Sequence, residues 1–170
     1  MQDAFAAYSE GLGKTLANLQ SLEFLLRLFL HNTQHPEPKW LEKGPTEMVV
    51  GDIVAETPLT DWSSLGVLID RYNGAVGEQS PLKVSRSVVD LRDALAHGRM
   101  FMPSMDEPPV LIRFEKPSGG RTRVIFRASA AEWLYQALQD VHAETAKVQA
   151  ALNEGRAAQQ RDEADEARDE

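Results

Sequence analysis

Two side chains that could act together on a phosphodiester stand close together near the middle of the chain. Arg92 is followed directly by Asp93, and His97 comes five positions after the arginine and just before Gly98. An arginine can neutralise charge that develops in a transition state, and a histidine can move a proton near neutral pH. The pattern therefore predicts acid–base chemistry on a phosphodiester, with Arg92, His97 and Asp93 as the candidate catalytic residues.

The segment around this pair has the pattern of a helix that ends at Gly98. Apolar residues recur there at intervals of three or four: Val84, Val88, Leu91 and Leu95. This spacing predicts a helix over about residues 83–97. Gly98 would end it, because glycine takes the left-handed conformation that closes a helix. His97 would then lie in the last turn, where the helix dipole favours a positive charge.

Helix geometry restricts how Arg92 and His97 can share one ligand. Five residues at about 100° each place the two side chains about 140° apart around the helix axis. Either the chain bends at Gly98, or a second copy of the protein completes the site. A simpler interpretation is that Arg92 pairs with Asp90, Asp93 or another carboxylate and that His97 only caps the helix. Short motifs match by chance often enough to keep both interpretations open.

The string Leu-Arg-Asp-Ala-Leu-Ala-His-Gly at 91–98 resembles the signature of the HEPN superfamily. In that signature an arginine is followed a few residues later by a histidine, near the end of a helix in an all-α domain. A polar residue, often asparagine, follows the arginine, and Asp93 stands there in this chain. Residues 88–99 match closely, and the resemblance extends in outline over residues 1–150.

The resemblance implies a metal-independent endoribonuclease, without cofactor, that acts as a homodimer with both motifs facing one cleft. His97 would be the general acid and base for attack by the RNA's own 2′-hydroxyl, Arg92 would stabilise the transition state, and Asp93 would orient one of them. Such a protein could be the toxin of a toxin–antitoxin pair, bound by its antitoxin, or a phage-defence component. The alternative is a non-catalytic dimeric module that binds nucleotide or a protein partner. The intact Arg92/His97 pair favours the enzyme, and Asp93 favours the module.

The charge distribution also favours the module. The net charge is −8 over 170 residues, and the tail 153–170 accounts for −4 of it, with seven acidic against three basic residues. The remaining −4 on residues 1–152 lacks the broad positive surface of a non-specific nucleic-acid binder. RNA binding would therefore need a local basic cleft. Its candidate residues are Arg27, Arg71, Arg86, Arg92 and Arg99.

Composition bounds the kind of protein. The absence of cysteine excludes disulfides and thiolate metal sites, and the start of the chain lacks the pattern of a signal peptide. The most apolar window, 22–30, is interrupted by Glu23 and Arg27 and is too short to span a bilayer. We therefore expect a cytoplasmic protein that does not enter a membrane.

Glu23 falls within the apolar stripe of the first predicted helix and therefore needs a partner. The simpler expectation is an intrahelical ion pair with Arg27, four residues on. The alternative is that Glu23 supports the site by reaching Arg92 and orienting it.

Apolar periodicity predicts a mainly α fold: a HEPN-like helical bundle with one β-hairpin before the C-terminal helix. Helices are expected over about 3–31, 62–75, 83–97 and 129–152, with an additional short helix near 45–55. The hairpin is expected over about 109–127, turning at Gly119 and Gly120. The domain would cover residues 1–152, followed by an acidic tail, 153–170, that is disordered or a frayed helix. Four scattered aromatic residues are expected in the core: Trp40, Trp62, Tyr72 and Trp133.

Overall fold

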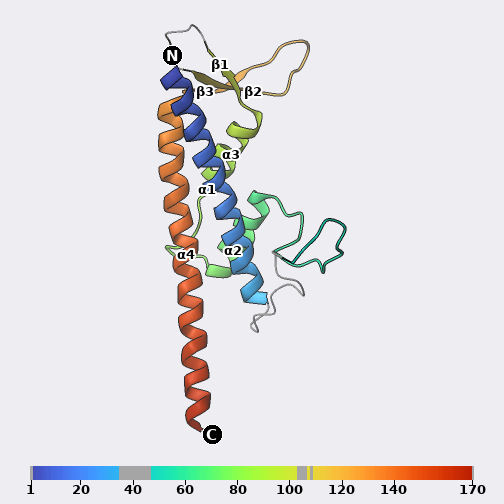
Figure 1. Cartoon of the computed structure of the whole chain (residues 1–170), viewed down its shortest axis with the longest axis vertical. Helices are drawn as coiled ribbons and strands as arrows, with labels where there is room; N and C mark the ends of the chain where they lie inside the picture. The colour runs from blue at the N-terminus through green and yellow to red at the C-terminus, as the bar shows by residue number, and fades with distance from the viewer. Residues whose placement is uncertain (1, 35–46, 103–106, 108, 170) are drawn as a thin grey trace. The chain divides into compact units, whose positions relative to one another are not determined.

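The computed structural model describes residues 2–34, 47–102, 107 and 109–169, and within them the protein is mainly helical (Figure 1). The helices are α1 (Gln2–Gln34), α2 (Leu65–Val76), α3 (Ser87–His97) and α4 (Ala130–Asp169). A small antiparallel sheet contains β1 (Arg99–Phe101), β2 (Val110–Phe114) and β3 (Val124–Ser129), in the order β1-β2-β3. A mainly α fold with a hairpin before the last helix is thereby confirmed. No helix among the described residues is long and apolar enough to cross a membrane.

The chain divides into two compact units, each of which uses part of α1 and part of α4. The first unit contains Met1–Ser21 and Ser85–Glu144, and therefore includes α3 and the sheet. The second unit contains Leu22–Val84 and Thr145–Glu170, and therefore includes α2. The Arg92/His97 motif belongs to the first unit.

The sheet of the first unit is larger than the predicted hairpin by one strand. Strands β2 and β3 form the hairpin, and Gly119 and Gly120 in its turn have φ angles of 60° and 74°, which favour glycine. Strand β1 follows α3 directly and pairs with β2, so that Arg99 lies opposite Ile112. A strand of three residues is too short to show an alternating pattern, which is why sequence reasoning missed it.

One face of the sheet is packed into the core of the first unit. Leu111 of β2 is buried in a cluster with Tyr8 of α1 and with Ala130 and Leu134 of α4. Burying a leucine side chain of this kind stabilises a fold by about 1.5–3 kcal/mol. The cluster therefore anchors β2. Because β1 pairs with β2, it also holds β1, the strand that follows the motif.

The second unit is centred on Tyr72 of α2, which is fully buried as expected. Its hydroxyl donates a hydrogen bond to the Leu82 carbonyl at 3.0 Å, and its ring meets Phe29 edge-on at 4.8 Å. The expectation for Trp62 is wrong, since this side chain is 100% exposed just before α2. Trp133 is half-buried, and Trp40 lies outside the described residues.

Two further expectations concern the predicted short helix near 45–55 and the acidic tail. Residues 47–55 contain no helix, so the predicted short helix near 45–55 is wrong over its described part. The acidic tail from residue 153 continues α4 as helix to Asp169. The side chains of 153–158, which include Glu154 and Arg156, are exposed, so this part of α4 is a solvated helix.

Candidate functional site

The motif lies on α3, which begins at Ser87 rather than near 83 and ends at His97. One face of α3 is buried through Val88 and Ala94. Arg92 and His97 lie away from this face: the Arg92 side chain is 48% exposed, and His97 is exposed. Because the apolar residues hold α3 against the unit, the two polar side chains are left accessible to a ligand in solvent.

Asp93 binds the motif arginine and a second arginine from the sheet. Its Oδ1 lies 3.0 Å from Nη1 of Arg92, and its Oδ2 lies 3.6 Å from Nη2 of Arg113 on β2. Ion pairs this exposed contribute only about 0–1 kcal/mol to stability. Their consequence is positional, because one carboxylate holds two guanidinium groups beside each other. Sequence reasoning missed Arg113, whose place beside Asp93 follows only from the packing of β2.

His97 stands at a sharp change from helix to strand, and Gly98 makes this change possible. The predicted helix end is confirmed, but the predicted reason is wrong: Gly98 has φ −70° and ψ 152°, an extended conformation. Its amide donates to the Ala94 carbonyl at 2.8 Å. A Cβ atom at this position would lie 2.3 Å from that carbonyl oxygen and 2.8 Å from Cδ1 of Leu111. Glycine is therefore required by close packing, not by a left-handed turn.

The candidate RNA-binding arginines divide between the two units. Arg99 begins β1, two residues after His97, and its guanidinium carbon lies 5.5 Å from the centre of the Phe114 ring. Arg86 is exposed just before α3. Both belong to the same unit as the motif, whereas Arg27 belongs to the second unit.

Arg27 makes the expected pair with Glu23 and, in addition, contacts that sequence reasoning did not foresee. Its side chain is only 12% exposed, and Nε and Nη2 donate to Glu23 at 3.3 and 2.9 Å. Nη1 donates to Oδ1 of Asp61 at 2.6 Å and to the carbonyls of Pro58 and Asp61, while Nη2 also reaches the Ser63 carbonyl. Nη1 and Nη2 therefore fix the 58–63 segment to α1, while Nε bonds to Glu23 within α1. For Glu23 the structure therefore shows the intrahelical pair with Arg27, which is the simpler of the two expectations.

Asp61 is the anionic centre of this network. Burial alone would raise the pKa of its carboxyl, but hydrogen bonds from Ser63, Arg27 and Arg71 lower it to about 2. Arg71 is another candidate for a basic RNA cleft. Its Nη1 lies 3.0 Å from Oδ2 of Asp61, so it belongs to this ion-pair network. Burial lowers the pKa of Arg27, and its bonds to Glu23 and Asp61 more than offset this. The network holds charges in place inside the second unit and leaves Arg27 no donor for a ligand.

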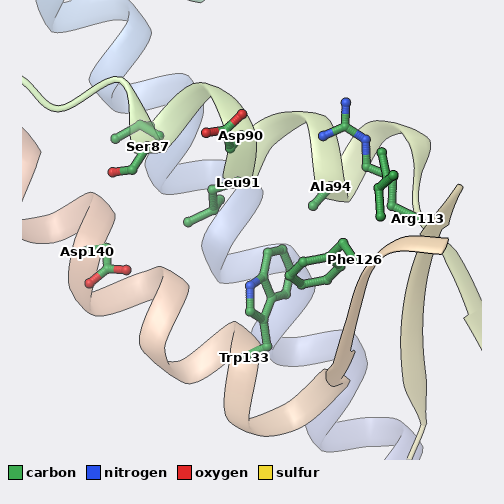
Figure 2. A pocket seen from close by; sticks show the side chains of 10 residues that line it. Ser87, Asp90, Leu91, Ala94, Arg113, Phe126, Trp133 and Asp140 are labelled. Carbon is green, nitrogen blue, oxygen red and sulfur yellow. The ribbon is translucent and has the colours of Figure 1, made fainter. Parts of the chain in front are cut away.

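A cavity of about 330 Å³ opens on the face of α3 that is turned toward the sheet and α4. Figure 2 shows Ser87, Asp90 and Asp140 toward one end, Arg113 toward the other, and the rings of Phe126 and Trp133 between them. These two rings meet edge-on with centres 5.4 Å apart. A cavity of this size, with aromatic walls and a few charged groups, lies in the range that small ligands occupy. Arg113 belongs both to this cavity and to the Asp93 pair.

The local charge around the motif differs from that of the whole chain. Helix α3 and the three strands carry four arginines (Arg92, Arg99, Arg113 and Arg127) against two aspartates (Asp90 and Asp93).

Within the part of the chain that the structure describes, no group of three His, Asp or Glu side chains could hold a metal ion. His97 is a group that can transfer a proton, and arginine is a group that can stabilise negative charge. Comparison of the chain with protein-family models, with curated proteins and with solved structures gives no match.

Proposed function

We propose that this protein is a HEPN-like endoribonuclease that cleaves RNA without a metal ion. The observation that carries the proposal is the arrangement on α3, where the accessible Arg92 is bonded to Asp93 and His97 stands exposed at the junction with β1. The surplus of arginines on α3 and the sheet supports it, because RNA needs a positive surface. Such an enzyme would act in the cytoplasm and would be restrained by a partner such as an antitoxin, or act in phage defence.

In the proposed reaction the RNA supplies its own nucleophile. The 2′-hydroxyl loses its proton to a base and attacks the adjacent phosphorus, and the 5′-oxygen leaves with a proton from an acid. His97 performs these proton transfers, and Arg92 neutralises the charge that builds up on the phosphoryl oxygens. Asp93 fixes the Arg92 guanidinium, which reduces the reorganisation needed when the substrate binds. The products are a 2′,3′-cyclic phosphate and a 5′-hydroxyl.

The proposed working unit is a homodimer with the two motifs near the interface. On one helix Arg92 and His97 point about 140° apart, so a single chain presents only one of them well to a given phosphate. A two-fold axis beside His97 would bring both motifs into one cleft, because such an interface uses the same patch of both subunits.

The cavity beside α3 favours a second candidate function, that of a non-catalytic binding module. Its aromatic pair, Phe126 and Trp133, could hold a flat ring, and Arg113 at one end could bind a phosphate or carboxylate. In that case the Arg92/Asp93 pair would be structural. A nucleotide is the ligand class that matches an aromatic wall with an arginine at one end.

The test is an RNA-cleavage assay in the presence of a chelator. Purified wild type should cleave total RNA, and Arg92→Ala and His97→Ala should each lose about 10²–10⁴-fold in rate. The matched controls are His142→Ala and Arg161→Ala, which change exposed residues of α4 outside the motif and should cleave like wild type. Cleavage by both motif variants at the wild-type rate would refute the enzyme. Absence of cleavage by wild type, together with saturable nucleotide binding lost in Trp133→Leu, would support the module.

A further inference from the structure

The outer face of the sheet carries arginine side chains together with aromatic side chains to which neither candidate function gives a role. Leu111 of β2 is buried in the core, and residues opposite each other on paired strands share a face. Its neighbours Ile112 and Val110 therefore point to the other face. Opposite Ile112 stand Arg99 on β1 and Arg127 on β3, so the outer face carries a row of two arginines around an isoleucine.

Two phenylalanines form a ring pair on this face. Phe101 is paired with Val110, and Phe114 is two residues on from Ile112, so both lie on the outer side. Their rings meet edge-on with centres 6.4 Å apart. Phe101 is 42% exposed, and Val124, opposite Phe114 on β3, is 52% exposed. Phe114 is half-buried, so Phe101 is the more accessible of the two rings, and core packing does not account for its exposure.

The charge of this face matches a polyanion. Arg99 and Arg127 lie on this face, and the three strands contain no acidic residue, although the whole chain has a net charge of −8. Arg127 is exposed, and Arg99 lies over the Phe114 ring as a cation–π pair. The turn between β2 and β3 adds Lys116, Arg121 and Arg123, against the single acid Glu115.

We infer that this face binds single-stranded RNA. Unpaired bases stack on Phe101 and Phe114, and Arg99 and Arg127 contact the phosphates on either side. Accessible rings beside arginines are the combination that single-stranded nucleic acids require, whereas the bases of a duplex are not available for stacking. Only Gly98 separates His97 from β1, so a strand held on this face lies next to the motif. The inference rests on the proposed function in naming RNA as the ligand.

The test measures RNA binding in the His97→Ala background, where the proposed function predicts that cleavage is slowed about 10²–10⁴-fold. The probe is a labelled single strand of about 12 nucleotides, compared with the same sequence as a duplex. Phe101→Leu and Phe114→Leu keep apolar bulk but remove the rings, and each should weaken binding about tenfold. Arg99→Gln with Arg127→Gln should lower the slope of log Kd against log salt by about 1.4, at about 0.7 for each phosphate contact. Tyr135→Leu and Arg161→Gln, exposed positions on α4, are the matched controls and should bind like the parent.

The outcomes separate this inference from the proposed function. Single-strand binding that depends on the rings supports the inference even if His97 proves unnecessary for cleavage. Three results would overturn it: no binding of the single strand, a preference for the duplex, or leucine variants that bind like the Tyr135→Leu control. A change of oligomeric state in the leucine variants, without a change of affinity, would instead make this face an interface between copies of the chain.

Discussion

Replacing Gly98 with alanine should destabilise the protein through a clash that the structure locates atom by atom. The new Cβ would lie 2.3 Å from the Ala94 carbonyl oxygen and 2.8 Å from Leu111 Cδ1. The first contact involves backbone and cannot be relieved by a rotamer change, and the second displaces a core residue of β2. Overpacking of this kind costs about 1–3 kcal/mol. The loss should be at the upper end of this range, because the hydrogen bond from the Gly98 amide to Ala94 is disturbed as well.

Gly13→Ala provides the matched control, because the same chemical change there should have the opposite sign. Gly13 lies inside α1 with no side chain or distant backbone within 4 Å of its added Cβ. Alanine in a helix interior is more stable than glycine by about 0.5–1 kcal/mol. Urea denaturation followed by circular dichroism should therefore give a lower midpoint for Gly98→Ala and a higher one for Gly13→Ala. A Gly98→Ala midpoint at or above that of wild type would refute the described junction between α3 and β1.

Three further predictions concern charge and assembly. Because the pKa of Asp61 falls from 3.8 to about 2 on folding, its ionised form stabilises the fold above pH 3.8, and this is lost as the pH falls through about 2. At neutral pH Asp61→Asn should thus be less stable than wild type by about 2 kcal/mol. When unfolding is measured by denaturation at a series of pH values, the difference in stability between the two proteins should shrink toward pH 2. A difference that stays constant with pH would contradict this. Asp93→Ala should slow RNA cleavage by up to about 10²-fold through a misplaced Arg92, while Asp93→Asn, which keeps an acceptor, should retain most of the rate in the same assay. Sedimentation at micromolar concentration should show a dimer, and a strict monomer would contradict the shared cleft. A dimer whose structure places the two His97 rings on opposite outer faces would contradict it as well.

The elements that sequence alone predicts are those with a local signal. Helices α1 and α4 have apolar residues at intervals of three or four over many turns, and α3 ends at a glycine as expected. The paired glycines 119 and 120 locate the hairpin turn. By contrast, β1 has three residues and forms because β2 offers it a partner. Its existence depends on a contact with residues about ten positions away.

The site follows the same division between local and distant contacts. Arg92, Asp93 and His97 can be selected from one short string, because all three lie on one helix. The role of Arg113 and the cavity beside α3 depend on how two strands and a helix pack, which no local pattern encodes. Arg27 shows the converse error. Its charge makes it a reasonable candidate for RNA, but its donors are taken up by Glu23 and by the 58–63 segment, which lies more than thirty residues away in the sequence.

The central claim is that the motif cleaves RNA by attack of the substrate's own 2′-hydroxyl, with His97 moving the proton. The most direct measurement is the chemical nature of the product ends after cleavage in a chelator, determined by mass spectrometry for wild type and for His97→Ala. Wild type should leave a 2′,3′-cyclic phosphate on one fragment and a 5′-hydroxyl on the other, and His97→Ala should give neither in the same time. Products with a 3′-hydroxyl and a 5′-phosphate, or cyclic phosphates formed equally fast by His97→Ala, would contradict the mechanism.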